Sequence, residues 1–204
     1  MRVYLDGGVF LNILWDFDGT LFNTYPAYTD ILYDLLGGKV DKSTIYQHLK
    51  VSVSHAISTF QLSGEQVKEM KQKSKNIKNS EMLPFPDVER VLQFADKNVI
   101  MTHKSFHGVV YILRHYGFEK YFSEIVTLEN GFPRKPDIGA YQYLHTKYHI
   151  DLAIGDRELD LIPAKKLGIQ TCMFQNTSPY ADFSLSNYEE FFNLFHLESS
   201  ETPI

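Results

Sequence analysis

The sequence predicts an α/β fold in which helices flank a parallel sheet and a helical segment is inserted after the first strand. Short apolar runs with strand character lie at residues 12–15, 99–101, 124–128, 152–154 and 170–174. Helical patterns separate most of these runs, and such alternation is typical of a parallel sheet. A chain of 204 residues, 44% of them hydrophobic, is long and apolar enough to bury one sizeable core.

The stretch between the first two predicted strands contains helical patterns but no convincing strand. We expect helices at residues 25–36, 43–49 and 54–61. Ser63, with Gln66 three residues later, has the spacing of a capping box and opens a longer helix. We therefore expect a discontinuous core of residues 11–22 and 84–196, and a helical domain of residues 23–83. Residues 1–10 show no clear periodicity, and we assign them no role.

Composition excludes several classes of protein. The formal net charge is −5, so the clustered basic surface of a nucleic-acid-binding protein is not expected. The single cysteine, Cys172, can form neither an internal disulfide nor a zinc site, which fits a reducing compartment. No apolar run is long enough to span a membrane, and the first residues lack a signal sequence. We expect a cytoplasmic protein without membrane partners, and leave its oligomeric state open.

The most informative segment is LWDFDGT, residues 14–20, in which an apolar strand ends in two carboxylates. Side chains two residues apart on an extended segment point the same way, so Asp16 and Asp18 can reach one small volume. Two carboxylates that close repel each other unless a cation or a proton lies between them. The alternative is a turn in which both residues cap backbone amides.

Other predicted strands also end in reactive residue types. Thr102 follows the second strand, Lys135 lies beyond the third, and Asp156 and Asp160 follow the fourth. In an open parallel sheet, ligands gather outside the carboxyl ends of the strands. Taken singly, each of these residues is more often a cap, a turn residue or a solvated side chain. Their joint occurrence favours a metal-assisted phosphoryl transfer.

Each residue type has a role in that chemistry. A carboxylate can attack phosphorus, and Asp16 at the strand end is the candidate nucleophile. Asp18 lies within reach as the acid that protonates the leaving oxygen and then activates water. Lys135 and Thr102 supply a positive charge and a hydroxyl to the phosphoryl oxygens. Magnesium prefers oxygen ligands, so Asp16, Asp18 and Asp156 are its candidate ligands, with Asp160 in support.

These segments together resemble the four motifs of the haloacid dehalogenase superfamily: residues 16–20, Thr102, Lys135-Pro136 and the GDRELD segment at 155–160. The resemblance implies a Rossmann-like three-layer core with a small helical cap, magnesium, and an aspartyl-phosphate intermediate. The branch that it resembles most contains phosphoglycolate phosphatases and β-phosphoglucomutases. Dehalogenases of the superfamily lack the second aspartate, so Asp18 favours phosphate chemistry.

The sequence identifies the residues that contact the substrate less clearly than the residues of the reaction centre. His103 stands where relatives often have asparagine, so the phosphate contacts at this position differ from the family pattern. The segment LKVSVSH, residues 49–55, resembles the part of the cap that faces the active site in this branch. Lys50, Ser52, His55 and His103 are therefore candidate substrate contacts, with Lys50 expected at the leaving group. Alternatively, Lys50, Ser52 and His55 are solvated loop residues or helix-capping residues without contact to the substrate.

The expected function is a magnesium-dependent phosphatase acting on small phosphorylated metabolites. A phosphomutase needs the same core and returns the phosphoryl group to a sugar instead of water. A phosphoacceptor signalling module, without turnover, also combines acidic residues, a threonine and a lysine on a parallel sheet. Isomerisation of a sugar phosphate without phosphate release would identify the phosphomutase, and rapid phosphate release from a model ester would exclude the signalling module.

Overall fold

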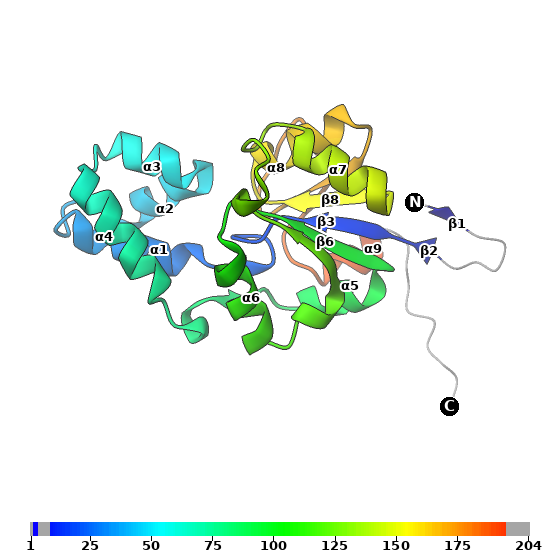
Figure 1. Cartoon of the computed structure of the whole chain (residues 1–204), viewed down its shortest axis with the longest axis horizontal. Helices are drawn as coiled ribbons and strands as arrows, with labels where there is room; N and C mark the ends of the chain where they lie inside the picture. Colours follow the sequence, from blue (N-terminus) through cyan, green and yellow to red (C-terminus); the bar gives the residue numbers. More distant parts are fainter. Residues whose placement is uncertain (1, 4–8, 195–204) are drawn as a thin grey trace.

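The chain forms a Rossmann-like α/β core around a six-stranded sheet, which confirms the predicted fold class (Figure 1). The computed structural model describes residues 2–3 and 9–194. All neighbouring strands of this sheet are parallel, in the order β10-β9-β8-β3-β6-β7. The strands are β3 (Asn12–Trp15), β6 (Lys97–Met101), β7 (Phe122–Val126), β8 (Leu152–Gly155), β9 (Gln170–Phe174) and β10 (Phe183–Leu185). Strand β10 was not predicted, because three residues are too few to show a period.

Helices cover both faces of the sheet. Helices α7 (Gly139–Tyr148) and α8 (Glu158–Lys166) lie on one side, and α5 (Val88–Phe94), α6 (Phe106–His115) and α9 (Glu190–Leu194) lie on the other (Figure 1). Ile13 and Trp15 belong to the apolar cluster that includes residues of α5, α6 and α9, whereas Leu14 belongs to the cluster that includes residues of α7 and α8. Because both faces are covered, the inner strands β3, β6 and β8 are mostly apolar, and their polar residues, Asn12, Lys97 and Asn98, lie at the amino ends.

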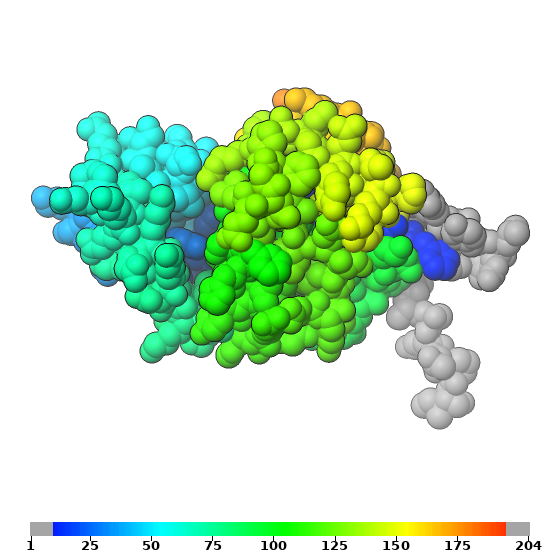
Figure 2. Space-filling model, in the orientation of Figure 1, coloured from blue at the N-terminus to red at the C-terminus, as the bar shows by residue number. Residues whose placement is uncertain are grey.

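The helical segment between β3 and the rest of the core forms a lobe beside the sheet (Figures 1 and 2). It contains α1 (Tyr25–Leu35), α2 (Lys42–Val51), α3 (Val53–Thr59) and α4 (Gly64–Lys75). We call these four helices the helical insertion. The capping box predicted at α4 is confirmed: Ser63 Oγ accepts from the Gln66 N–H, and Gln66 Oε1 accepts from the Ser63 N–H.

A short ribbon of two strands next to the helical insertion was not predicted. Strands β4 (Phe22–Asn23) and β5 (Leu83–Pro84) pair as a short antiparallel ribbon where the chain leaves the core and returns. The expectation of no strand in residues 22–83 was therefore wrong. Two-residue strands, one of them with proline, carry no alternation that a sequence could reveal.

At the N-terminus, β1 (Arg2–Val3) and β2 (Val9–Phe10) pair antiparallel, and the 3-10 turns η1 (Asn79–Glu81), η2 (Glu119–Tyr121) and η3 (Leu128–Asn130) complete the described elements. The other residues of the unassigned segment 1–10 lie outside the described part. No helix within residues 2–3 and 9–194 is long and apolar enough to cross a membrane.

Candidate active site

Three neighbouring strands bring the predicted residues to one edge of the sheet. Strand β3 lies between β6 and β8, and Trp15, its last residue, is in register with Ile100 and Ile154. Asp16, Thr102 and Asp156 each follow directly after one of these strands. Since the strands are parallel and level, the three side chains start from the same edge.

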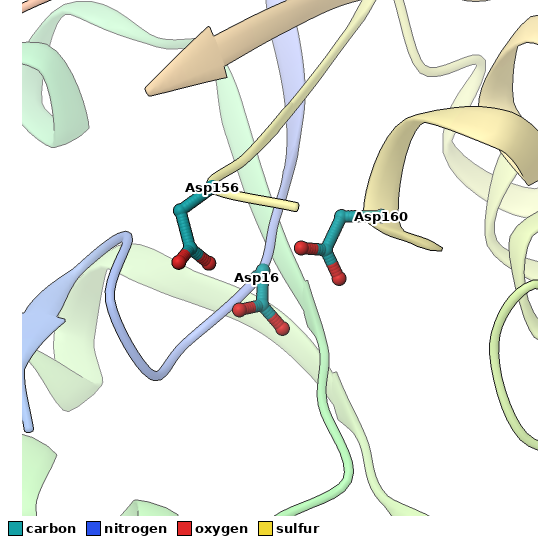
Figure 3. Close-up of side chains that lie close together, drawn as sticks. All are labelled: Asp16, Asp156 and Asp160. Atoms are coloured by element: carbon teal, nitrogen blue, oxygen red, sulfur yellow. The ribbon is translucent and has the colours of Figure 1, made fainter. Parts of the chain in front are cut away.

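The carboxylates of Asp16, Asp156 and Asp160 converge at this edge (Figure 3). One oxygen of each lies within 4.8 Å of the others, and the residues are 1%, 0% and 2% exposed. Asp160 comes from the first turn of α8 and packs against Gly155, where an added Cβ would lie 2.3 Å from Asp160 Cβ. Glycine at the end of β8 is therefore needed for the carboxylates to approach. The side chain of Asp18 is not one of these three.

Lys135 lies between two of the carboxylates. Its Nζ is 2.6 Å from Asp16 Oδ1 and 2.8 Å from Asp160 Oδ1, and all three side chains are buried. Burial alone would lower the pKa of Lys135, but Asp16 and Asp160 outweigh it and raise the pKa above the ordinary value. Lys135 is therefore a fixed ammonium ion beside Asp16.

Arg157 is a second cation in the cluster, and its role was not predicted. Its guanidinium lies 3.6 Å from Asp16, 3.8 Å from Asp156 and 3.4 Å from Asp160. The side chain is 16% exposed. Arg157 lies within the segment 155–160, which resembles a family motif, so the sequence drew attention to this position. The contacts of its side chain with Asp16 and Asp156 depend on the fold.

The carboxylates differ in their readiness to ionise. Burial and the charge of Asp160 raise the pKa of Asp16 to about 7, against the opposing effect of Lys135 and Arg157. Burial alone would raise the pKa of Asp160, but Arg157 and Lys135 lower it to about 2. Burial also raises the pKa of Asp156, partly offset by Arg157 and Lys50. A further cation would favour the ionised form of all three.

Asp156 is held by residues from the helical insertion. Its Oδ2 accepts from Lys50 Nζ of α2 at 2.7 Å and from the Tyr25 hydroxyl of α1 at 3.0 Å. Thr20 donates to Oδ1 at 3.4 Å. The sequence indicated Lys50 as a substrate contact, and the structure places it on a core carboxylate. Tyr25 carries no motif that could have identified it.

Asp18 lies on the loop after β3, apart from the three buried carboxylates, with its side chain 25% exposed. Its Oδ1 accepts a hydrogen bond from Lys104 Nζ at 3.0 Å. Gly19, the next residue, has φ +82°, and an added Cβ would lie 2.2 Å from the Tyr25 ring. The loop therefore has a conformation that glycine adopts readily and other residues rarely do.

Thr102 and His103 shape the loop after β6. Thr102 is buried, and its Oγ1 accepts from the Lys104 N–H at 3.2 Å. Nε2 of His103 accepts from the Lys135 N–H at 3.0 Å. Burial and the charges of Lys135 and Arg134 lower the pKa of His103 to about 4. The imidazole of His103 is thus a neutral acceptor for the backbone N–H of Lys135.

Ser52 and His55 make contacts within the insertion. Ser52 Oγ accepts from the His55 N–H at 2.9 Å and caps α3. The imidazole of His55 lies 3.0 Å from that of His48. In the described part of the chain, neither side chain has a hydrogen bond to the carboxylate cluster, and both contacts match the alternative of local cap residues.

The cluster fits a metal ion. Asp16 Oδ2 is buried and has no hydrogen-bond partner among the described residues. Three carboxylates that can each offer an oxygen form the donor set that hard divalent cations prefer. A buried nucleophile candidate, a fixed ammonium ion and a candidate cation site lie together, which suits the transfer of an anionic group.

Comparisons with known proteins identify a family and similar folds. Residues 13–174 match the family model described as haloacid dehalogenase-like hydrolase. A sequence search of curated proteins finds no match. Among solved structures, a hydrolase from Streptococcus pneumoniae TIGR4 is 26% identical, with 92% of this chain and 98% of that chain covered and a TM-score of 0.65.

Two further solved structures share the fold at lower identity. A HAD-superfamily hydrolase of subfamily IA, variant 1, from Geobacter sulfurreducens PCA is 18% identical, covers 92% of this chain and 97% of its own, and has a TM-score of 0.70. A protein described as a predicted phosphoglycolate phosphatase from Haemophilus somnus 129pt is 20% identical, covers 91% and 98%, and has a TM-score of 0.71.

Proposed function

Because the chain belongs to the haloacid dehalogenase-like hydrolase family, we propose that it is a phosphatase of small phosphorylated metabolites, with Asp16 as its nucleophile. The observation that supports this most is the setting of Asp16. Its carboxylate is buried at the end of an inner strand, with Lys135 Nζ 2.6 Å from Oδ1. Among the described residues none forms a hydrogen bond with Oδ2, and the Arg157 guanidinium lies 3.6 Å from it. A buried carboxylate oxygen without a hydrogen bond is costly, and it is available to bond to phosphorus or to bind a cation.

The reaction has two steps. In the first, an oxygen of Asp16 bonds to phosphorus while the bond from phosphorus to the leaving oxygen breaks, and Asp18 gives its proton to that oxygen. In the second, Asp18 takes a proton from water as the water oxygen attacks phosphorus. The bond from phosphorus to Asp16 then breaks, which releases inorganic phosphate and restores the free carboxylate of Asp16 and the proton on Asp18.

Positive charge around Asp16 stabilises the transferring group. Lys135 offsets the charge on Asp16 and on the phosphoryl oxygens, and the Thr102 hydroxyl is a neutral donor to the same oxygens. Arg157, 3.6 Å from Asp16, adds a second positive charge. Fixed charges of this kind favour the transition state because they need no reorganisation during the transfer.

Magnesium is the metal that we propose for the site. Asp16, Asp156 and Asp160 would hold it, with Asp160 in place of Asp18 among the side-chain ligands first expected. When bound, magnesium supplies Lewis-acid polarisation of the phosphoryl group. Its charge also favours the ionised form of Asp16, whose pKa lies near 7 without it.

The helical insertion, within residues 23–83, is proposed as a cap domain on the core of residues 11–22 and 84–196. Lys50 and Tyr25 support this assignment, since both reach Asp156 from the insertion. A cap over the site excludes water during the first transfer. Lys50 remains the candidate for a contact with the leaving group.

Phosphate release from a panel of phosphate esters, with and without Mg²⁺, tests the proposal. The panel includes phosphoglycolate and hexose phosphates, because one structural neighbour is described as a predicted phosphoglycolate phosphatase and another as a putative beta-phosphoglucomutase. We expect Mg²⁺-dependent release that Asp16→Asn lowers by about 10³-fold or more. Turnover of Asp16→Asn at a tenth of wild type would refute the nucleophile. Isomerisation of a sugar phosphate without release would identify a phosphomutase, and stable phosphorylation without turnover would identify a signalling module.

A further inference from the structure

Lys104 lies beside the active site and has no role in the steps described above. It belongs to the loop between β6 and α6, where its N–H donates to Thr102 Oγ1. Its Nζ donates to Asp18 Oδ1 and to the Tyr28 hydroxyl, each at 3.0 Å. Asp18 comes from the loop after β3 and Tyr28 from α1 of the insertion, so one ammonium ion joins three segments of the chain.

The surroundings of Lys104 fix its ammonium in place. The side chain is 11% exposed, and Nζ lies 5.8 Å from the centre of the Phe17 ring and 5.2 Å from that of Tyr28. Burial alone would lower the pKa of Lys104, but Asp18 and Tyr28 raise it above its ordinary value. A cation enclosed by two rings and held by two acceptors has few rotamers left.

We propose that Lys104, held by Tyr28, is a positioning residue that orients Asp18 for proton transfer to the leaving group. The ammonium engages Oδ1 of Asp18 and leaves Oδ2 to carry the proton toward the leaving oxygen. Asp18 is partly exposed on a loop, so without Lys104 its carboxyl group would have several rotamers to choose from. Proton transfer needs hydrogen-bond reach in the reactive complex, and loss of orientation slows that step.

This inference rests on the proposed phosphatase reaction and predicts a selective defect. An ester with an acidic leaving group, p-nitrophenyl phosphate, depends little on an acid catalyst. Phenyl phosphate, whose leaving group is far less acidic, depends on it strongly. The value of kcat/KM reports the first transfer, so the ratio of kcat/KM for the two esters measures how well the acid acts.

The variants are Lys104→Met, Lys104→Arg and Tyr28→Phe, with Asp18→Asn as the reference for a lost acid. We expect Lys104→Met to lower kcat/KM about tenfold on phenyl phosphate and less than about threefold on p-nitrophenyl phosphate. Lys104→Arg should restore most of the ratio, and Tyr28→Phe should give a smaller change in the same direction. The control is Lys120→Met, which removes an exposed lysine whose Nζ lies over the Tyr121 ring.

The outcomes separate the two proposals. A merely structural role of Lys104 would lower kcat/KM equally on both esters and would overturn the inference. An unchanged ratio in Lys104→Met, with a selective loss in Asp18→Asn, would overturn it as well and leave the phosphatase reaction standing. If Asp18→Asn shows no selective loss, the assignment of Asp18 fails first. Thermal unfolding of each variant confirms that it is folded.

Discussion

At the scale of single residues, Gly19 controls how closely the loop after β3 approaches the insertion. An alanine here has both a positive φ of +82° and a Cβ 2.2 Å from the Tyr25 ring. We expect Gly19→Ala to lower the free energy of unfolding by more than about 2 kcal/mol. Turnover should fall too, because the same Cβ would lie 2.7 Å from Asp156 Oδ2.

Substitutions at two other glycines distinguish the effect of a positive φ from the effect of the close Cβ contact. Gly37 has φ +64° but no atom within 4 Å of an added Cβ, so Gly37→Ala should cost only the conformational part, about 1 kcal/mol. Gly64 in α4 has neither constraint, and Gly64→Ala should be neutral or slightly stabilising. Urea unfolding of the three variants measures this, and equal losses at positions 19 and 37 would exclude the close contact as a cause.

At the scale of elements, helix α2 joins the insertion to the active site through Lys50. Its Nζ lies 2.7 Å from Asp156 Oδ2, with side chains 16% and 0% exposed. Lys50→Met would leave a buried carboxylate without its ammonium partner, and such losses are severe. We expect a fall in kcat/KM of about tenfold and a lower Tm.

The same helix supplies the control. Lys42 is also paired, with Asp30, but both side chains are more than half exposed. Surface pairs contribute little, so Lys42→Met should change kcat/KM less than about twofold. Kinetics and thermal unfolding of both variants distinguish a local effect of Lys50 from a general effect of removing charge on α2. Equal behaviour of the two variants would contradict the role given to Lys50.

The sequence predicted the strands, and the residues that follow them, where a run of apolar residues marks the strand. The apolar runs at β3, β6 and β8 and the residues after them place Asp16, Thr102 and Asp156 at one edge, because parallel neighbouring strands end together. The partners of long side chains across the fold were not predictable. Lys50 was expected near the site, but not on Asp156, and Arg157 lies in a segment that resembles a family motif, but its contact with Asp16 depends on the fold. Lys104 and Tyr25 reach Asp18 and Asp156 only after the insertion has packed, and no spacing in the sequence indicates these contacts.

At the scale of the whole molecule, the carboxylate cluster links stability, pH and metal binding. The pKa of Asp16 is raised from 3.8 to about 7, so between these pH values the folded chain binds more protons than the unfolded chain at this group. Its contribution to stability is therefore present at low pH and is lost as the pH rises through about 7. Magnesium binds the ionised form, so its binding should strengthen over the same range.

This predicts a pH-dependent stabilisation by Mg²⁺. We expect saturating Mg²⁺ to raise Tm by about 2 °C near pH 6 and by at least about twice that near pH 8. Differential scanning fluorimetry at both pH values measures the shift, with Asp156→Asn as a variant that lacks one of the proposed ligands. A shift that is equal at the two pH values, or larger near pH 6, would contradict the assignment of Asp16 as a ligand that must ionise.

The most direct test of Asp16 as the nucleophile is to detect the phosphoryl group on its carboxylate during turnover. The wild-type enzyme is mixed with p-nitrophenyl phosphate and Mg²⁺, quenched in acid within one turnover, and digested for mass spectrometry of the peptide that contains residues 14–20. We expect a phosphorylated Asp16 that appears before phosphate is released and disappears when the substrate is exhausted. Release of phosphate at the full rate with this peptide unmodified at every time point would contradict it.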